Sequence, residues 1–206
     1  MKYLNGCSKN FKNFFNWSIE YLGKYDKKVI IVNNKSVVQD GIKCSGWCDD
    51  EEIVIARKNP FFQEVFVHEF CHMQQNIQES PYWKDTSLFW RHLSKDKVAI
   101  NSWDSVLDII SLERDCERRA ISLSKKWKLF DNKIYAKRAN LYLYYYQYVF
   151  LKRKWTNSTS IYHPYLVDVM PEKILPMSQF KTINMPLMQL FEDCIDKNGK
   201  FYKIKI

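Results

Sequence analysis

The chain has 206 residues, of which 46% are hydrophobic and 27% are charged, a composition typical of folded globular proteins that excludes a disordered chain. The formal net charge of +9 favours an acidic partner such as nucleic acid, although a lysine-rich surface also simply keeps a protein in solution. The longest apolar stretch, residues 141–151, is far shorter than the roughly 20 residues that span a bilayer, so we expect a soluble protein with no membrane partner.

The first half of the chain alternates between helical and strand patterns. Apolar residues recur at helical spacing over residues 8–24, and two short apolar runs, at 28–32 and 53–56, predict buried strands. Pro60 stands where a helix can begin, and residues 61–77 have the pattern of a helix. This order predicts a small sheet with helices before and after it in the sequence.

The second half is predicted to be mainly helical. Residues 82–101 are polar and irregular, and Ser102 can cap a long helix over residues 103–128. A further helix is predicted over residues 134–155, and the four prolines beyond it indicate loops with short helices. We therefore expect an α+β fold in a single domain of residues 1–206.

The six cysteines predict an intracellular, cytoplasmic protein with reduced thiols, because the N-terminal sequence is polar and interrupted, unlike a secretory signal. Cys71 and Cys116 fall within predicted helices, where small thiols pack as apolar side chains. Cys44 and Cys48 have a spacing that metal ligands can use, but no second cysteine pair completes a four-ligand site. We expect these two to be ordinary strand or turn residues.

The strongest chemical signal is the segment His68-Glu-Phe-Cys-His72 in the predicted helix 61–77. Two histidines four residues apart lie on one face of a helix, one turn apart, so both imidazoles can reach one zinc ion at about 2.0–2.1 Å. Glu69 follows the first histidine and can hold a water molecule at the metal. Two unrelated surface histidines are the alternative, but both lie within an otherwise apolar run.

A catalytic zinc ion needs a third protein ligand, and the helix 103–128 offers candidates. One of its stripes at helical spacing should face the core and contains Val106, Ile110, Glu113, Glu117, Ala120 and Ser124. Because buried carboxylates are costly unless paired or metal-bound, we predict Glu113 as the ligand. Glu117, one turn later, is predicted to accept the ring N–H of a ligand histidine, and neutralisation of both carboxylates by nearby arginines remains the alternative.

These residues resemble the gluzincin metallopeptidases, in particular the ImmA/IrrE-like and phage-type minimal members. The likeness rests on His68-Glu69-x-x-His72 and on the later Glu113-Arg-Asp-Cys-Glu117-Arg-Arg-Ala. It covers roughly residues 28–130, which leaves 131–206 as a helical C-terminal extension. The chain departs from the pattern because it carries Glu117 where aspartate is common.

The resemblance implies a zincin-like fold, a zinc cofactor and a protein or peptide substrate. It further implies that the strand before the motif helix is an exposed sheet edge that binds the substrate backbone, which here assigns that role to Ile53, Val54, Ile55 and Ala56. A plain core strand is the alternative for these four residues.

The resemblance and the chemistry give one mechanism, in which zinc activates a water molecule and Glu69 is the general base. Gluzincins often use a downstream histidine or tyrosine as a second stabiliser of the oxyanion, and His163 is the candidate here, although a surface histidine would also fit. The alternatives are a basic nucleic-acid-binding module, since residues 125–154 hold nine Lys or Arg, and a zinc-stabilised binding protein without turnover.

Overall fold

The computed structural model describes residues 4–39, 41–83, 103–153 and 161–194. Helices and strands are both present in the described part, so the α+β class is confirmed. The chain divides into two compact units, one made of Met1–Lys84 and Cys116–Asn132 and the other of Asp85–Asp115 and Lys133–Ile206. The expectation of a single domain stays a prediction, and the two units are described separately below.

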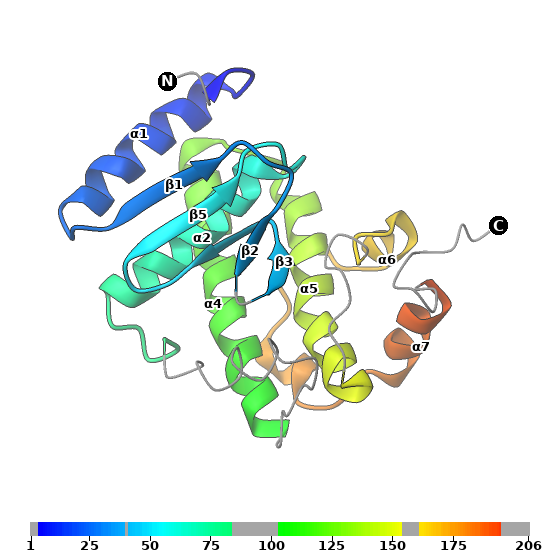
Figure 1. Ribbon diagram of the computed structural model, residues 1–206. Coiled ribbons are helices and arrows are strands. Elements are labelled where there is room, and N and C mark those ends of the chain that lie inside the picture. Colours follow the sequence, from blue (N-terminus) through cyan, green and yellow to red (C-terminus); the bar gives the residue numbers. More distant parts are fainter. Residues whose placement is uncertain (1–3, 40, 84–102, 154–160, 195–206) are drawn as a thin grey trace. The chain divides into compact units, whose positions relative to one another are not determined.

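The first unit contains a three-stranded sheet with the order β1-β5-β4 (Figure 1). β1 (Lys28–Val32) runs parallel to β5 (Glu52–Ala56), and β4 (Gly46–Cys48) runs antiparallel to β5. β2 (Val37–Gln39) and β3 (Ile42–Cys44) form a separate antiparallel pair. The sequence predicted none of the short strands β2 to β4 as elements and indicated only that Cys44 and Cys48 are strand or turn residues.

The predicted edge strand is wrong, because β5 is the central strand of the sheet. It pairs with β1 on one side and with β4 on the other, and its apolar residues are buried: Ile53, Ile55 and Ala56 are fully buried, and Val54 is 7% exposed. A run that is apolar at every position is typical of a strand covered on both faces. The edges of this sheet are therefore β1 and β4.

Two helices and the end of a third pack in the first unit. α1 (Lys9–Gly23) begins at Ser8, whose hydroxyl accepts the N–H of Phe11, and it contacts β1. α2 (Phe62–Ile77) packs on β4 and β5. The hydrophobic core between these helices consists of aromatic rings, and it includes Phe11, Phe14, Phe15, Phe66 and Phe70. Burying each ring contributes about 1.5–3 kcal/mol, so this core holds α2 firmly in place.

Gly46 allows β4 to lie very close to α2. A Cβ atom at this position would be 2.7 Å from Cδ1 of Ile55 and 2.8 Å from Cγ1 of Val65. Atoms of real side chains do not approach so closely, so any larger residue would push β4 away from the helix. This contact fixes the edge strand next to the helix that carries the histidine motif.

The second unit is helical. It contains the first part of α4 (Trp103–Trp127), most of α5 (Asn132–Lys152), α6 (Pro164–Asp168), the 3-10 helix η3 (Met177–Phe180) and α7 (Met185–Cys194). The centre of α5 is buried nearly all round, and its Tyr148 ring lies 5.2 Å from the ring of Phe191 on α7. The helices predicted at 103–128 and 134–155 are confirmed to within three residues at each end.

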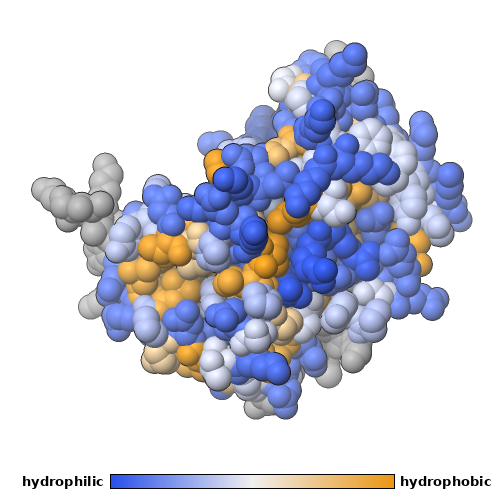
Figure 2. Space-filling model, turned by 180° about the vertical axis from the view of Figure 1, so that it is seen from behind, coloured by the Kyte–Doolittle hydropathy of each residue, from blue (hydrophilic) through white to orange (hydrophobic). Residues whose placement is uncertain are grey.

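No helix in the described part of the chain is both long enough and apolar enough to cross a membrane. The face drawn in Figure 2 is mainly hydrophilic, with hydrophobic residues gathered in places between the polar ones. All six cysteines are free thiols, as expected, and Cys71, Cys116 and Cys194 are buried.

Candidate metal centre

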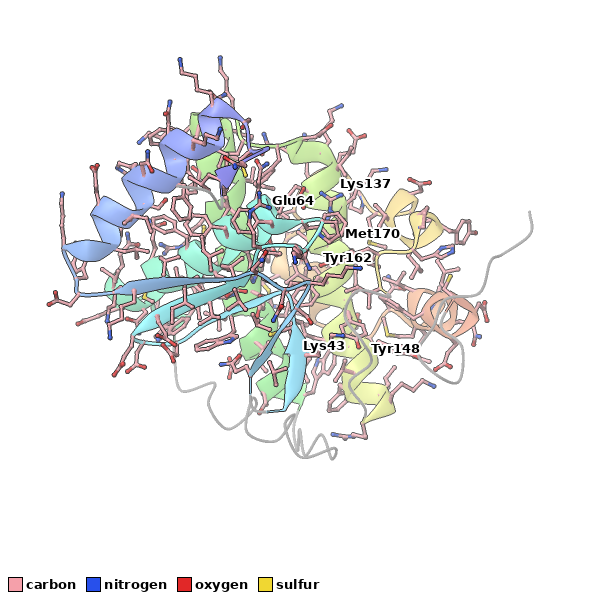
Figure 3. The ribbon with its side chains drawn as sticks, turned by 45° about the horizontal axis from the view of Figure 1, so that its top comes forward. Lys43, Glu64, Lys137, Tyr148, Tyr162 and Met170 are labelled. Carbon is pink, nitrogen blue, oxygen red and sulfur yellow. The ribbon has the colours of Figure 1, made fainter. Side chains whose placement is uncertain are left out.

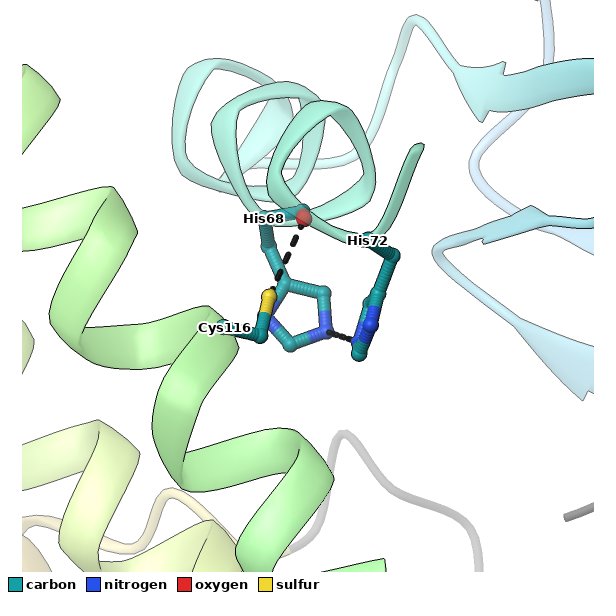
Figure 4. A group of neighbouring side chains, drawn as sticks. All are labelled: His68, His72 and Cys116. Atoms are coloured by element: carbon teal, nitrogen blue, oxygen red, sulfur yellow. Dashed lines mark hydrogen bonds between the residues drawn. The ribbon is translucent and has the colours of Figure 1, made fainter. Parts of the chain in front are cut away.

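α2 places the two histidines of the motif on one face. The helix begins after Asn59, whose side-chain oxygen accepts the N–H of Phe61 at 2.8 Å. His68 and His72 are one turn apart, their ring centroids are 4.6 Å apart, and their Nε2 atoms approach each other to 3.1 Å (Figure 4). The four-residue spacing of the motif therefore brings the two imidazole rings together on one face of α2, as the sequence predicted.

Each histidine has an acceptor at its other ring nitrogen. Nδ1 of His72 lies 2.8 Å from Oε1 of Gln75, and Nδ1 of His68 lies 3.2 Å from Oε1 of Glu117. An acceptor at Nδ1 places the ring proton there and leaves the Nε2 lone pair for a ligand bond. With their ring protons on Nδ1, both histidines present an Nε2 lone pair to the same point, as two ligands of one metal ion would.

The geometry of this point suits a metal ion. Two nitrogens that bind one tetrahedral zinc ion at 2.0–2.1 Å are about 3.3 Å apart, close to the 3.1 Å between the two Nε2 atoms. Two lone pairs directed at each other repel unless a proton or a cation lies between them. Oε2 of Glu117 is buried and has no hydrogen-bond partner among the described residues, which leaves negative charge next to His68.

Cys116 on α4 completes a group of three residues that can hold a metal ion. The ligand atoms of His68, His72 and Cys116 all lie within 4.8 Å of one another. The Cys116 thiol is 3.6 Å from Nδ1 of His68 and donates to the carbonyl oxygen of His68 at 3.2 Å. We call these three residues, with their partners Gln75 and Glu117, the metal centre.

Glu113, the predicted third ligand, is buried, with 2% exposed. Its Oε1 accepts a hydrogen bond from the hydroxyl of Tyr146 at 3.0 Å, and the oxygen of that hydroxyl lies 3.2 Å from the hydroxyl of Tyr142, from which it can accept. Burial, and then the Glu113 carboxylate, raises the pKa of Tyr146 well above its usual value, so Tyr146 stays a donor. Glu113 belongs to the second unit, and its role as a ligand stays a prediction.

Glu69, the predicted general base, is buried in α2 with 8% exposed. Its charge acts on Cys44 at the end of β3 and on Cys48 at the end of β4. Burial first, and then the Glu69 carboxylate, raises the pKa of Cys44 to about 12 and that of Cys48 well above its usual value. Both cysteines are therefore neutral near pH 7, and neither belongs to the metal-holding group found among the described residues.

His163, the predicted second stabiliser, lies at the N-cap of α6 in the second unit. Its Nδ1 accepts the backbone N–H of Tyr165 at 3.3 Å. This bond caps the short helix, which explains the residue structurally, and its role in catalysis stays a prediction.

Sequence reasoning missed two members of the metal centre. Gln75 follows His72 by three residues, and this spacing places the two side chains on the same face of α2. Cys116 precedes Glu117 directly, but we interpreted it as an ordinary buried thiol. The signal for Gln75 was a polar residue on a face of the helix that is otherwise buried, where the structure leaves it fully enclosed.

A separate cavity of about 500 Å³ lies at the start of α2. Its lining includes Arg57, Asn59, Gln63 and Glu64, and Figure 3 shows Glu64 on the first turn of that helix. Arg57 stacks on the ring of Phe62 and donates to the carbonyl oxygen of Asn5 at 2.7 Å. None of the residues of the metal centre lines this cavity.

We compared the chain with the sequence models of protein families, with curated proteins and with solved structures, and none of them matches it.

Proposed function

We propose that this protein is a zinc-dependent endopeptidase that hydrolyses a peptide bond in a specific protein substrate. One observation carries the proposal: the Nε2 atoms of His68 and His72 converge to 3.1 Å, while each Nδ1 has an acceptor that holds its proton. Zinc is the expected ion because imidazole nitrogens with one anionic ligand form the tetrahedral set that a catalytic zinc ion uses.

Glu69 is the residue that would move the proton. When bound, the ion would supply a Lewis acid that makes a water molecule more acidic and polarises the scissile carbonyl group. Glu69 follows His68 directly and is held in the buried part of α2. Its carboxylate would accept the proton of the water and deliver it to the leaving amine.

The third ligand would come from α4, which carries two candidates. Glu113 fits the sequence pattern, whereas Cys116 belongs to the group whose ligand atoms lie within 4.8 Å of one another. The position of the Cys116 thiol near Nδ1 of His68 favours a positioning role, because one ring cannot bind the same ion through both nitrogens. Zinc affinities of Cys116→Ala and Glu113→Ala decide between them: the true ligand shows the larger loss.

The substrate backbone would bind along β4. This strand is an edge of the sheet, and among the described residues it pairs only with β5. An unpaired edge can add an extended peptide as a further strand. The close approach at Gly46 holds β4 against α2, so a peptide on this edge would run beside the helix that carries Glu69.

The test is the variant Glu69→Gln, which keeps the shape of the side chain and removes the base. Wild-type protein, Glu69→Gln and His72→Ala are each incubated with a peptide library, and cleavage is read by mass spectrometry alongside zinc content. We expect cleavage by the wild type only, with zinc retained by Glu69→Gln. Cleavage by Glu69→Gln at the wild-type rate would overturn the mechanism.

Two other functions stay predictions. A zinc-holding binding protein without turnover would retain zinc and cleave nothing in this test. Nucleic-acid binding has less support than the charge suggests, because the aromatic residues of α5 that could stack on bases, among them Tyr144, Tyr145, Tyr146 and Tyr148, are buried. A steep salt dependence of binding to DNA or RNA would support it.

A further inference from the structure

A row of aromatic rings runs along one side of α1, apart from the residues of the metal centre. The ring of Trp17 stacks on that of Tyr21 at 5.7 Å between centroids, and the ring of Tyr21 lies 5.3 Å from that of Tyr25. Residues four apart on a helix share a face, so the first two rings lie side by side, and Tyr25 follows in the turn after the helix. We call Trp17, Tyr21 and Tyr25 the aromatic row.

The aromatic row is anchored at one end and exposed at the other. The rings of Trp17 and Tyr21 lie 5.6 and 5.8 Å from the buried ring of Phe70 on α2. Trp17 also lies 5.6 Å from Trp127, at the end of α4. Tyr25 is 46% exposed, and Tyr21 is the one aromatic ring among the described residues that contacts it. A flat ring from outside the protein can therefore extend the row by stacking on Tyr25.

The surroundings of the aromatic row are basic. The ammonium group of Lys126 lies 5.9 Å from the centroid of the first ring of the row, which is a cation–π contact. The side chain of Asn10 donates to the carbonyl oxygen of Lys128 at 3.3 Å, so the start of α1 lies beside the end of α4. Residues 9–28 and 124–130 together hold eight lysines and two acidic residues. This excess of positive charge favours a polyanion as the partner.

We infer that the aromatic row is a binding surface for single-stranded nucleic acid, in which one base stacks on Tyr25 and the phosphates are neutralised by the lysines around the row. Proteins that bind single strands without reading their sequence combine a basic surface with aromatic side chains on which bases stack. The buried tyrosines of α5 cannot act in this way, whereas Tyr25 is on the surface. The inference does not rest on the metal centre.

An anionic membrane surface is the other polyanion that a basic helix can bind, and α1 does not suit it. A helix that lies in a lipid interface inserts a continuous apolar face. The apolar face of α1 packs in the core, where Phe11, Phe14 and Leu22 are among its buried side chains. The one exposed large hydrophobic side chain within α1 is that of Ile19, two residues from Trp17 and therefore on another face of the helix.

The experiment measures the binding of a fluorescein-labelled oligothymidylate of about 16 nucleotides to the full chain by fluorescence anisotropy, at about 50 to 200 mM NaCl. Tyr25→Ala removes the exposed ring, and Tyr25→Phe keeps the ring without its hydroxyl group. Tyr82→Ala is the matched control, because Tyr82 is 47% exposed and lies outside the row. Lys126→Gln removes one charge beside the row, and its control is Lys35→Gln, which removes an exposed charge elsewhere in the first unit.

We expect the wild type to bind the oligonucleotide with an affinity that falls steeply as the salt concentration rises. Tyr25→Ala should weaken binding about tenfold, within the range for the loss of one stacked base, whereas Tyr25→Phe and Tyr82→Ala should bind like the wild type. Lys126→Gln should reduce the slope of log affinity against log salt by about 0.7, the value for one phosphate contact on a single strand, and Lys35→Gln should leave the slope unchanged.

Three results would overturn the inference. The first is no binding of the oligonucleotide at about 50 mM NaCl. The second is equal affinity for Tyr25→Ala and Tyr82→Ala, which would show that the exposed ring of the row has no part in binding. The third is binding to phosphatidylserine vesicles in place of the oligonucleotide, which would assign the surface to a membrane. None of these results bears on the proposed peptidase activity, whose test measures cleavage and zinc content.

Discussion

Two groups of buried polar side chains, one in each unit, differ in how their hydrogen-bonding capacity is used. In the metal centre, histidines and their acceptors leave two Nε2 lone pairs directed at one point, and Oε2 of Glu117 lacks a partner among the described residues. In the second unit, Asn140 and Gln147 on α5 bind only backbone groups. We call these two residues the amide clamp.

Each side-chain amide of the clamp uses both of its N–H donors and its oxygen in hydrogen bonds. Asn140 donates to the carbonyl oxygens of Pro171 and Lys173 and accepts the N–H of Leu175. Two turns later on α5, Gln147 donates to the carbonyl oxygens of Phe180 and Thr182 and accepts the N–H of Asn184. Each amide thus makes three hydrogen bonds, and the segment 171–184, which has little regular structure of its own, is held along α5.

This difference distinguishes buried polar groups that the fold itself explains from buried polar groups that indicate a ligand. Buried polar groups are almost always hydrogen-bonded, so a saturated group is explained by the fold alone. Two ring nitrogens that face each other at 3.1 Å need a proton or a cation between them, and a bound cation would meet that need. The following predictions test whether the metal centre and the amide clamp separate in this way.

The largest effect is expected for His72→Ala. A catalytic zinc ion is held by only three protein ligands, so the loss of one should leave almost no zinc after gentle dialysis. The wild type should hold about one ion per chain, measured by elemental analysis. His163→Ala is the control and should keep its zinc, and if both variants lose zinc equally the assignment to α2 is wrong.

The next effect concerns the amide clamp. Gln147→Leu removes the side-chain partners of two carbonyl oxygens and one N–H, and each buried group left without a partner costs about 1–3 kcal/mol. We expect the free energy of unfolding to fall by at least about 3 kcal/mol in urea titrations, with unchanged zinc content in the native protein. Zinc loss from the folded variant would contradict the separation of the two groups.

A smaller effect is expected for Glu117→Gln. The amide keeps the shape of the side chain but removes the charge that holds the His68 proton on Nδ1. Zinc affinity should fall about 10–100-fold, the range for partners of ligand histidines, while stability in the absence of zinc changes little. Competition with a chelator measures the affinity. An unchanged affinity would mean that Glu117 is a buried structural carboxylate rather than a partner of the ligand.

Much of the fold could be predicted from the sequence because its long elements have simple patterns. α2 and α4 agree with prediction to within about one residue at each end, since apolar periodicity dominates there. The three-residue strands β2 to β4 could not be predicted, because they are too short to show a period and are defined by pairing with other strands. The wrong edge strand has a different origin: the family resemblance assigned the edge to the strand before the motif helix, whereas here β4 pairs with the second side of that strand.

The site could be predicted only as far as spacing along one helix determines it. The positions of His68 and His72 follow from the four-residue spacing, and the convergence of their Nε2 atoms follows from helical geometry. The sequence indicated Glu117 as an acceptor for the ring N–H of a ligand histidine, because a carboxylate on a buried stripe needs a partner; its Oε1 lies 3.2 Å from Nδ1 of His68, and its role at a metal stays a prediction. Cys116 could not be singled out, because a buried thiol has the same pattern whether it packs or binds a metal.

The smallest expected effect is a pH dependence that arises outside both groups, at Cys44, whose pKa is raised by burial and then by the Glu69 carboxylate. The folded-state pKa of Cys44 is raised to about 12, from the value of 9.0 expected for an open chain. A raised pKa means that the stabilising contribution of the neutral thiol is complete below about pH 9 and is lost as the pH rises toward 12. Between pH 8 and pH 10 the loss is about 1.4 kcal/mol at most, and Cys44→Ala should remove it from urea titrations. Burial is the larger cause of the shift, so Glu69→Gln should retain most of this pH dependence; if it removes all of it, the charge of Glu69 and not burial controls the thiol.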